Sequence, residues 1–339
     1  MATFINRQKE LAYLKNWLNQ EPNSLLFVYG PKSSGKTSLI TQLIEYHLNL
    51  KKMAINYMNL RGVLLYDFSS FLDTFFTKTT KGKFREILAG VSINLGFFKV
   101  GLDDEALLKQ NPFRVMEGQL TTAKKKGLMP VLIIDEIQNL KSSYLNGERY
   151  LLDELFNLFV RLTKELHVAH VLLLTSDSYF LEDIYTNAKL KKTVRFLMID
   201  HLEKTEVLKW LSAEGLSSED SSTVYNYLGG SPWEITECLK LIAQGRSVTE
   251  SCAFFVQEEW SKLQDYFLWN IPSDHSKEII HQVHQSIADE GYYLINDDAN
   301  LQPILRDMVD QNFWFYKADE RKIVANSPSI RNAICRMVG

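Results

Sequence analysis

Short apolar runs alternate with amphipathic helical stretches over residues 1–200. Leu25 to Tyr29 is an unbroken apolar run, the pattern of a strand that is buried on both faces of a parallel sheet. After it, apolar residues recur at helical spacing from Leu39 to Leu48. The same alternation continues along the chain, and it predicts an α/β fold with right-handed crossovers. We expect a five-stranded parallel sheet with helices on both faces, and its strands at 25–29, 53–59, 131–135, 171–175 and 194–199.

Beyond residue 200 the pattern is mainly helical. Four amphipathic stretches are separated by glycines and predict a small helical lid, at 203–213, 219–228, 232–243 and 249–268. A third section has two helical stretches, 277–289 and 302–311, followed by short strands at 313–316 and 322–325, an order that suggests a winged-helix module. The predicted division is therefore an α/β domain at 1–200 with a Phe-rich helical insertion at 61–112, a lid at 201–272 and a winged helix at 273–339.

Candidate chemistry begins directly after the first strand. Gly30 to Thr37 match the phosphate-binding pattern G-x-x-x-x-G-K-[ST], and they lie between a predicted strand and a predicted helix as the mechanism requires. Glycines let backbone N–H groups approach phosphate oxygens, and the helix that follows presents its positive end to the same anion. Lys36 then reaches the β- and γ-phosphates, and Thr37 offers its hydroxyl to Mg²⁺. The alternative is a glycine turn followed by an exposed lysine. We expect the nucleotide to be held by Gly30, Pro31, Lys32, Ser33, Ser34, Gly35, Lys36, Thr37 and Ser38.

Two adjacent carboxylates follow the third predicted strand. Asp135 and Glu136 end the apolar run at the edge where α/β sheets bind ligands. Asp135 suits a role in holding Mg²⁺ through water, and Glu136 suits the general base that deprotonates the attacking water. Acidic residues at strand ends also cap helices, which is the alternative reading. Together with the P-loop, the pair indicates hydrolysis as well as binding.

Composition is ordinary for a globular protein. The chain has 339 residues, of which 45% are hydrophobic and 23% charged, and its net charge is −3. It contains no apolar run of the length that spans a membrane, and the first seven residues lack a signal-peptide core. Its three cysteines are Cys238, Cys252 and Cys335, an odd number without close pairing that fits reduced thiols. These features predict a cytoplasmic protein with no membrane partner.

The motifs together resemble a known family. The N-terminal Phe4-Ile5-Asn6-Arg7, the P-loop, the acidic strand end, Leu174 to Asp177 and the Gly-Gly-Ser-Pro at 229–232 occur in that order. The chain resembles an archaeal-type ATPase of the STAND branch of P-loop NTPases, which are related to the AAA+ proteins.

The resemblance implies further site roles. It places Phe4 and Arg7 near the adenine, Thr175 and Ser176 at a sensor position for the γ-phosphate, and Pro232 against the nucleotide base. Each has a structural alternative: Phe4 as a core anchor, Thr175 and Ser176 as a strand end, and Pro232 as part of the Ser-x-x-Glu capping box.

One departure from the family's pattern bears on the rate. Relatives commonly carry Gly-Arg just before the fifth strand, where the arginine assists at the γ-phosphate, whereas this chain has Lys192-Thr193. Arg195 is a candidate replacement, although a strand arginine is as often a surface residue. Because such a charge contributes on the order of 10³-fold or more, its loss predicts slow hydrolysis.

Three functions are consistent with the sequence. The first is an ATP- and Mg²⁺-dependent switch that hydrolyses slowly and acts on a protein partner or on itself. The second is a DNA-binding initiator-like ATPase, but residues 275–339 hold seven Lys and Arg against nine Asp and Glu, a balance that repels phosphate. The third is a nucleotide-binding scaffold that never turns over.

Overall fold

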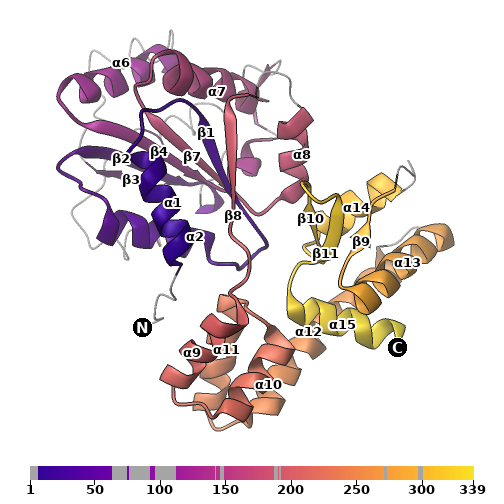
Figure 1. The fold of residues 1–339 in the computed structure, drawn as a ribbon. Helices are drawn as coiled ribbons and strands as arrows, with labels where there is room; N and C mark the ends of the chain where they lie inside the picture. Colours follow the sequence, from indigo (N-terminus) through magenta and orange to yellow (C-terminus); the bar gives the residue numbers. More distant parts are fainter. Residues whose placement is uncertain are drawn as a thin grey trace.

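A central sheet, a helical bundle and a C-terminal α+β part make up the described structure (Figure 1). This computed structural model describes residues 7–62, 75, 92–95, 112–141, 143–145, 149–186, 190, 192–270, 273–296 and 301–339. Within these ranges, no helix is both long and apolar enough to cross a lipid bilayer.

The central sheet has six strands in the order β3-β2-β4-β7-β1-β8. Five of them are parallel, which confirms the predicted sheet. The sixth, β3, pairs antiparallel with β2 at the edge. The strands are β1 (Leu25–Tyr29), β2 (Met53–Asn59), β3 (Ser92–Leu95), β4 (Met129–Asp135), β7 (His170–Thr175) and β8 (Val194–Met198).

Alternate side chains of strands such as β1 and β7 pack on opposite faces of the sheet, and helices cover both faces. Leu26, Val28 and Leu172 pack with α1 (Gln8–Leu18) and α2 (Lys36–Gln42), which continues as a π-helical turn at Leu43–His47. On the other face, Leu25, Phe27 and Leu173 pack with helices that come later in the chain. These are α6 (Pro112–Lys125), α7 (Leu151–Val160) with its π-helical extension Arg161–Glu165, and α8 (Ser178–Thr186).

The segment expected as a helical insertion, 61–112, lies mostly outside the described residues. Its described residues include the end of a 3₁₀ turn at Gly62, Phe75 in helical conformation, and Ser92–Leu95, which form strand β3. Phe75 is fully buried, and its carbonyl oxygen accepts a hydrogen bond of 2.9 Å from Asn56 Nδ2 in β2. A small hairpin, β5 (Tyr144–Leu145) and β6 (Arg149–Tyr150), was not expected from the sequence.

Four helices form the bundle after β8, and their bounds agree closely with the amphipathic stretches. Gly215, Gly229 and Gly245 lie at or just after helix ends with positive φ, a conformation that glycine adopts without a Cβ penalty. The helices are α9 (Lys204–Ala213), α10 (Ser218–Leu228), α11 (Pro232–Ala243) and α12 (Val248–Trp269).

The C-terminal part packs on two sides. Its apolar core includes Leu263 and Tyr266 of α12 and also Tyr179 of α8, so it joins the bundle to the central sheet's outer helix (Figure 1). Its three-stranded sheet has the order β10-β11-β9. The elements are α13 (Asp274–Glu290), β9 (Tyr293–Leu294), α14 (Leu301–Asp310), β10 (Trp314–Lys317), β11 (Lys322–Ala325) and α15 (Pro328–Val338).

Candidate functional site

The phosphate-binding loop lies where β1 ends and α2 begins. Gly30 is required there because a Cβ on it would lie 2.0 Å from the carbonyl oxygen of Ile199. Gly35 has φ of 92°, and Lys36 starts the helix directly after it. Lys32, Ser33, Thr37 and Ser38 are exposed, whereas Pro31 and Ser34 are buried.

Lys36 is folded back onto its own loop. Its Nζ donates to the carbonyl oxygens of Gly30 at 2.9 Å and Pro31 at 2.8 Å. Burial lowers the pKa of Lys36 to about 8, although Glu136 and Asp135 oppose this effect. Ser34 Oγ is buried and has no hydrogen-bond partner among the residues that the structure describes. The loop therefore holds a cation and an unused hydroxyl donor, both of which suit a phosphate group.

Asp135 and Thr37 converge from the ends of two elements. Thr37 Oγ1 donates to Asp135 Oδ2 at 2.7 Å, and Tyr57 Oη donates to the same oxygen at 3.0 Å. Burial raises the pKa of Asp135, a sign that its negative charge is poorly compensated here. Hydroxyl and carboxylate oxygens are the ligands that Mg²⁺ prefers, and this ion binds through one or two such groups plus waters and phosphates. The donor set therefore fits Mg²⁺ held by Thr37 and Asp135.

Glu136 follows at the turn after β4. Its φ of 61° places it in the left-handed region, which is uncommon for a residue with a Cβ and turns the chain sharply at this strand end. Its Oε1 forms an ion pair with Arg61, and its Oε2 accepts a hydrogen bond from Gln138 Nε2. The side chain is buried but lies beside the P-loop lysine, whose pKa its charge raises.

Sequence reasoning missed Arg61 and Tyr57. Both lie on or just after β2, which pairs with β4 so that Asn59 lies opposite Asp135. Their contacts with the acidic pair depend on this adjacency. The signal in the sequence is their position at the end of a predicted strand, but a single chain does not reveal which strands are neighbours.

Thr175 ends β7, the strand between those that carry the P-loop and the acidic pair. Thr175 lies opposite Tyr29 of β1, and its Oγ1 accepts a hydrogen bond of 3.0 Å from the backbone N–H of Asp177. Ser176 follows and is half-buried. Strand order thus brings the predicted sensor residues to the same edge as the P-loop.

Arg7 connects the N-terminal helix to the loop. Its Nη2 donates to the carbonyl oxygens of Ser34 at 2.6 Å and Asp200 at 2.7 Å, and its Nη1 pairs with Glu10 at 3.0 Å. The guanidinium therefore ties α1, the P-loop and the segment that leads to the lid. Phe4 lies outside the described residues.

Pro232 brings the lid to the loop. The ring of Pro232 lies 3.8 Å from the position that a Cβ on Gly35 would take. Two glycines just before it allow this approach, since a Cβ on Gly230 would lie 1.9 Å from Leu202 O and one on Gly229 would lie 2.3 Å from the Pro328 ring. The turn at 229–232 therefore contacts the sheet domain and the C-terminal part together.

Arg195 is not brought to this cluster. It is exposed in the edge strand β8 and lies opposite Leu26, three residues before the end of β1. At about 3.3 Å per residue, it is about 10 Å from the carboxyl edge of the sheet.

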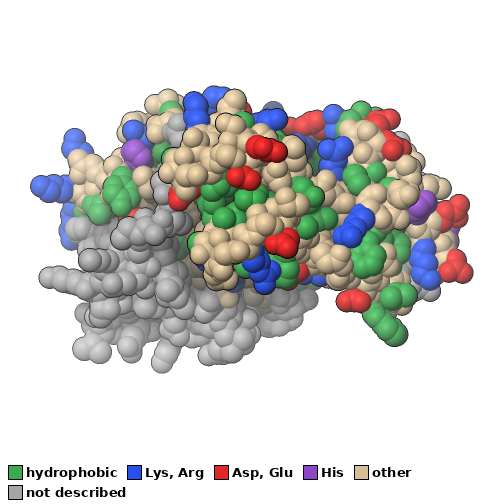
Figure 2. All heavy atoms as spheres, turned by 90° about the horizontal axis from the view of Figure 1, so that it is seen from below, with side chains coloured by type: hydrophobic (Ala, Val, Ile, Leu, Met, Phe, Trp, Pro, Cys, Tyr) green, Lys and Arg blue, Asp and Glu red, His purple; other side chains and the backbone are tan. Residues whose placement is uncertain are grey.

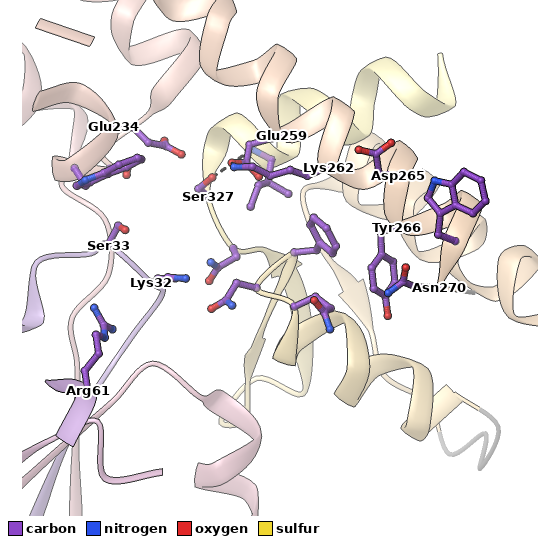
Figure 3. A pocket seen from close by; sticks show the side chains of 18 residues that line it. Lys32, Ser33, Arg61, Glu234, Glu259, Lys262, Asp265, Tyr266, Asn270 and Ser327 are labelled. Carbon is purple, nitrogen blue, oxygen red and sulfur yellow. Dashed lines mark hydrogen bonds and ion pairs between the residues drawn. The ribbon is translucent and has the colours of Figure 1, made fainter. Parts of the chain in front are cut away.

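A cavity of about 850 Å³ opens beside the P-loop, between the three parts of the chain (Figure 3). Lys32, Ser33 and Arg61 line its sheet side, and Glu234 of α11 lines its lid side. Glu234 Oε1 accepts a hydrogen bond of 2.5 Å from Ser329 Oγ, while Oε2 is buried without a partner among the described residues. Burial raises the pKa of this carboxyl to about 7.

The fold and these motifs define the class of protein: an α/β P-loop NTPase fold with the acidic pair on the strand two places from the P-loop strand. Residues 4–238 match the model of a family described as an ATPase domain predominantly from Archaea, and the chain belongs to that family.

Relatives and solved structures agree on this class. The chain is 38% identical over 319 residues to an ATP-binding protein of Methanocaldococcus jannaschii, an alignment that covers 92% of both chains. A second such protein of that organism is 40% identical over 268 residues, 77% of this chain and 74% of the other.

Among solved structures, the Walker-type ATPase of Pyrococcus abyssi superposes with a TM-score of 0.65 at 13% identity, covering 98% of this chain and 96% of the other. The ORC2 protein of Aeropyrum pernix gives 0.56 at 14% identity, covering 98% and 93%. At such low identity these two similarities concern the fold alone.

Proposed function

We propose that this chain is an ATP-dependent molecular switch that hydrolyses ATP slowly and acts on protein partners. The observation that carries the proposal is the convergence of Lys36, the Thr37–Asp135 pair and Glu136 at one edge of the sheet, beneath a lid that touches the loop through Pro232. ATP is the nucleotide named for the relatives from Methanocaldococcus jannaschii.

Each residue has a role that its surroundings support. Lys36 leaves its two carbonyl partners to bind the phosphates, because a polyphosphate compensates an ammonium group better than neutral carbonyls do. Thr37 and Asp135 hold Mg²⁺, which neutralises phosphate charge when bound. Glu136 accepts a proton from the attacking water, and Thr175 with Ser176 senses the γ-phosphate. Phe4 and Arg7 border the part of the site that takes the adenine, and Pro232 contacts the base from the lid.

We expect slow turnover because Glu136, the proposed general base, is already paired. Glu136 is already engaged by Arg61 and Gln138, so it must lose one of these partners before it accepts a proton. The Gly-Arg of relatives is replaced by Lys192-Thr193, and Arg195 lies away from the cluster.

A switch also requires that the nucleotide state reaches a second part of the chain. The C-terminal part, which we interpret as a winged helix, contacts the residues around the site. Tyr316 N donates to Ser178 Oγ at 3.0 Å, just after the sensor strand, and Lys317 Nζ lies 3.4 Å from Asp200 Oδ2. These contacts hold the C-terminal part against the sheet domain. Loss of the γ-phosphate at the loop would therefore change the arrangement of the two parts that the contacts stabilise.

Charge and packing disfavour DNA as the partner. Helix α14 packs against α8, and the Arg306 guanidinium lies over the Tyr179 ring at 5.7 Å. The described surface in Figure 2 intermixes Lys and Arg with Asp and Glu instead of gathering the basic side chains into one patch.

The experiment that tests the proposal is phosphate release by Glu136→Gln and its parent. The variant keeps the shape of the side chain but cannot accept the proton, so we expect it to retain ATP affinity while turnover falls at least tenfold. Glu165→Gln, at an exposed carboxylate that precedes β7, is the matched control and should turn over like the parent. A Glu136→Gln protein that hydrolyses ATP at the parent rate would remove Glu136 from the role of base, and a parent that binds ATP without any turnover would be a scaffold.

A further inference from the structure

Arg61 reaches the acidic pair from the neighbouring strand. β2 and β4 end level with each other, and a 3₁₀ turn at Leu60–Gly62 follows β2. The turn is fixed on both sides: Arg61 N donates to Asn59 Oδ1 at 3.0 Å, and Asn139 Nδ2 donates to Leu60 O at 3.2 Å. The backbone of Arg61 is therefore held beside the end of β4.

The side chain of Arg61, in contrast, is accessible. It is 64% exposed, whereas its ion-pair partner Glu136 is 10% exposed. It lines the same cavity as Lys32 and Ser33 of the P-loop, and Figure 3 shows its guanidinium directed toward that loop. Its charge also lowers the pKa of Lys36, a further sign that it lies close to the phosphate-binding lysine. Arg61 can thus change partner within the site without any movement of its backbone.

Apart from Lys32 and Lys36 of the P-loop itself, three described cations around the site are paired or distant. Arg7 bonds to two backbone carbonyls and Glu10, on the side of α1. Lys141 pairs with Asp177 at 2.8 Å. Arg195 lies about 10 Å back along the edge strand.

We propose that Arg61 is a catalytic residue that contacts the terminal phosphate of bound ATP from the end of β2. This inference rests on the proposed function. In the structure the guanidinium pairs with one carboxylate. A terminal phosphate offers more charge and three oxygens to its planar fork, so it competes well for the same group.

The exchange of partners links binding to chemistry. When Arg61 moves to the phosphate, Glu136 loses an ion pair, and its Oε1 is free to accept a hydrogen bond from the attacking water. The water oxygen then bonds to the γ-phosphorus while the bond to the β,γ-bridging oxygen breaks, and that oxygen leaves with the electron pair on ADP. The water proton passes to Glu136 and then to the released phosphate, and Arg61 stays protonated throughout.

Nucleotide binding, measured by calorimetry, tests the contact without turnover. Arg61→Ala, Arg61→Lys and the parent are titrated with ADP and with a non-hydrolysable ATP analogue in Mg²⁺. We expect Arg61→Ala to lose at least fivefold in affinity for the analogue while its affinity for ADP stays within twofold. Arg61→Lys should recover part of the loss, because it keeps the charge but not the fork. Arg161→Ala is the control, since it removes an arginine from an exposed ion pair with Glu117 before β7.

Single-turnover rates complete the test. Arg61→Ala should hydrolyse at least tenfold more slowly than the parent at saturating ATP, and Arg161→Ala at the parent rate. Equal loss of ADP and analogue affinity, or hydrolysis by Arg61→Ala that is as fast as or faster than the parent, would overturn the proposal while leaving the proposed function intact. A parent that binds neither nucleotide would overturn both.

Discussion

Lys36 illustrates how a single buried side chain is prepared for an anion. Its ammonium is satisfied by two loop carbonyls, and burial lowers its pKa to about 8. The motif alone predicted that this residue binds phosphate. The folded-back position was not predictable from the motif, because it depends on where the carbonyls of Gly30 and Pro31 lie in the folded loop.

The lowered pKa of Lys36 predicts a pH dependence of ATP binding. Below about pH 8 the free protein already carries the proton, so affinity should be steady. Above it, the free protein loses a proton that the phosphates would hold in the complex, so affinity should fall by up to about tenfold per pH unit. Calorimetry at pH 7, 8 and 9 measures this. Lys36→Ala should bind weakly at every pH, and a parent whose affinity is equal at pH 7 and pH 9 would contradict the assignment.

The turn between α10 and α11 matters at the scale of elements. Gly229 and Gly230 let this turn pack against Leu202 and Pro328, which places Pro232 over the P-loop. The sequence indicated a helix break here, and the resemblance indicated a nucleotide contact. The contact with Pro328 was not predictable from the sequence, since it joins residues about 100 positions apart.

Alanine in place of Gly230 and of Gly118 should change the free energy of unfolding in opposite directions, because the two glycines differ in the space around them. Gly230→Ala places a methyl group 1.9 Å from a backbone oxygen, so we expect a loss of about 1–3 kcal/mol in the free energy of unfolding. Gly118→Ala, in helix α6 with open space around it, should instead stabilise by roughly 0.5–1 kcal/mol. Urea unfolding of both variants measures these changes. A Gly230→Ala protein as stable as the parent would show that the close packing of Gly230 against Leu202 is not needed for stability.

Local pattern accounts for most elements but not for their arrangement. Buried strands such as β1 and β7 are continuous apolar runs, so they were visible in the sequence. Strand β3 was not expected, because a four-residue antiparallel edge strand leaves a weak pattern. The placement of β7 between β1 and β4, and hence of Thr175 beside the P-loop, depends on long-range pairing that one sequence does not encode locally.

The whole molecule is organised around contacts that converge near the P-loop. The lid and the C-terminal part meet at Glu234 and Ser329, while His201 Nε2, in the segment between β8 and the lid, bonds to Asn326 O of the C-terminal part at 3.0 Å. Each contact joins parts of the chain that are far apart in sequence. A change in the position of one part therefore changes the contacts of the others.

Glu234 predicts how stability depends on pH. Its pKa is raised from 4.5 to about 7 by burial, so between these values the folded protein holds a proton that the unfolded chain releases. The free energy of unfolding therefore falls as pH rises across this window, and the loss persists above pH 7. Glu234→Gln should be more stable than the parent at pH 8 by about 3 kcal/mol and about equal to it near pH 4.5. Glu237→Gln, at a more exposed carboxylate of the same helix, is the control, and a parent and Glu234→Gln with the same pH dependence would refute the prediction.

In the switch that we propose, the γ-phosphate of the nucleotide holds the turn at 229–232 against the P-loop. Hydrogen exchange of the backbone amides at 229–236 tests it most directly, in the Glu136→Gln protein saturated with ATP and Mg²⁺ or with ADP and Mg²⁺. We expect the backbone amides at 229–236 to exchange at least tenfold more slowly with ATP than with ADP. Equal exchange in the two nucleotide states would contradict it.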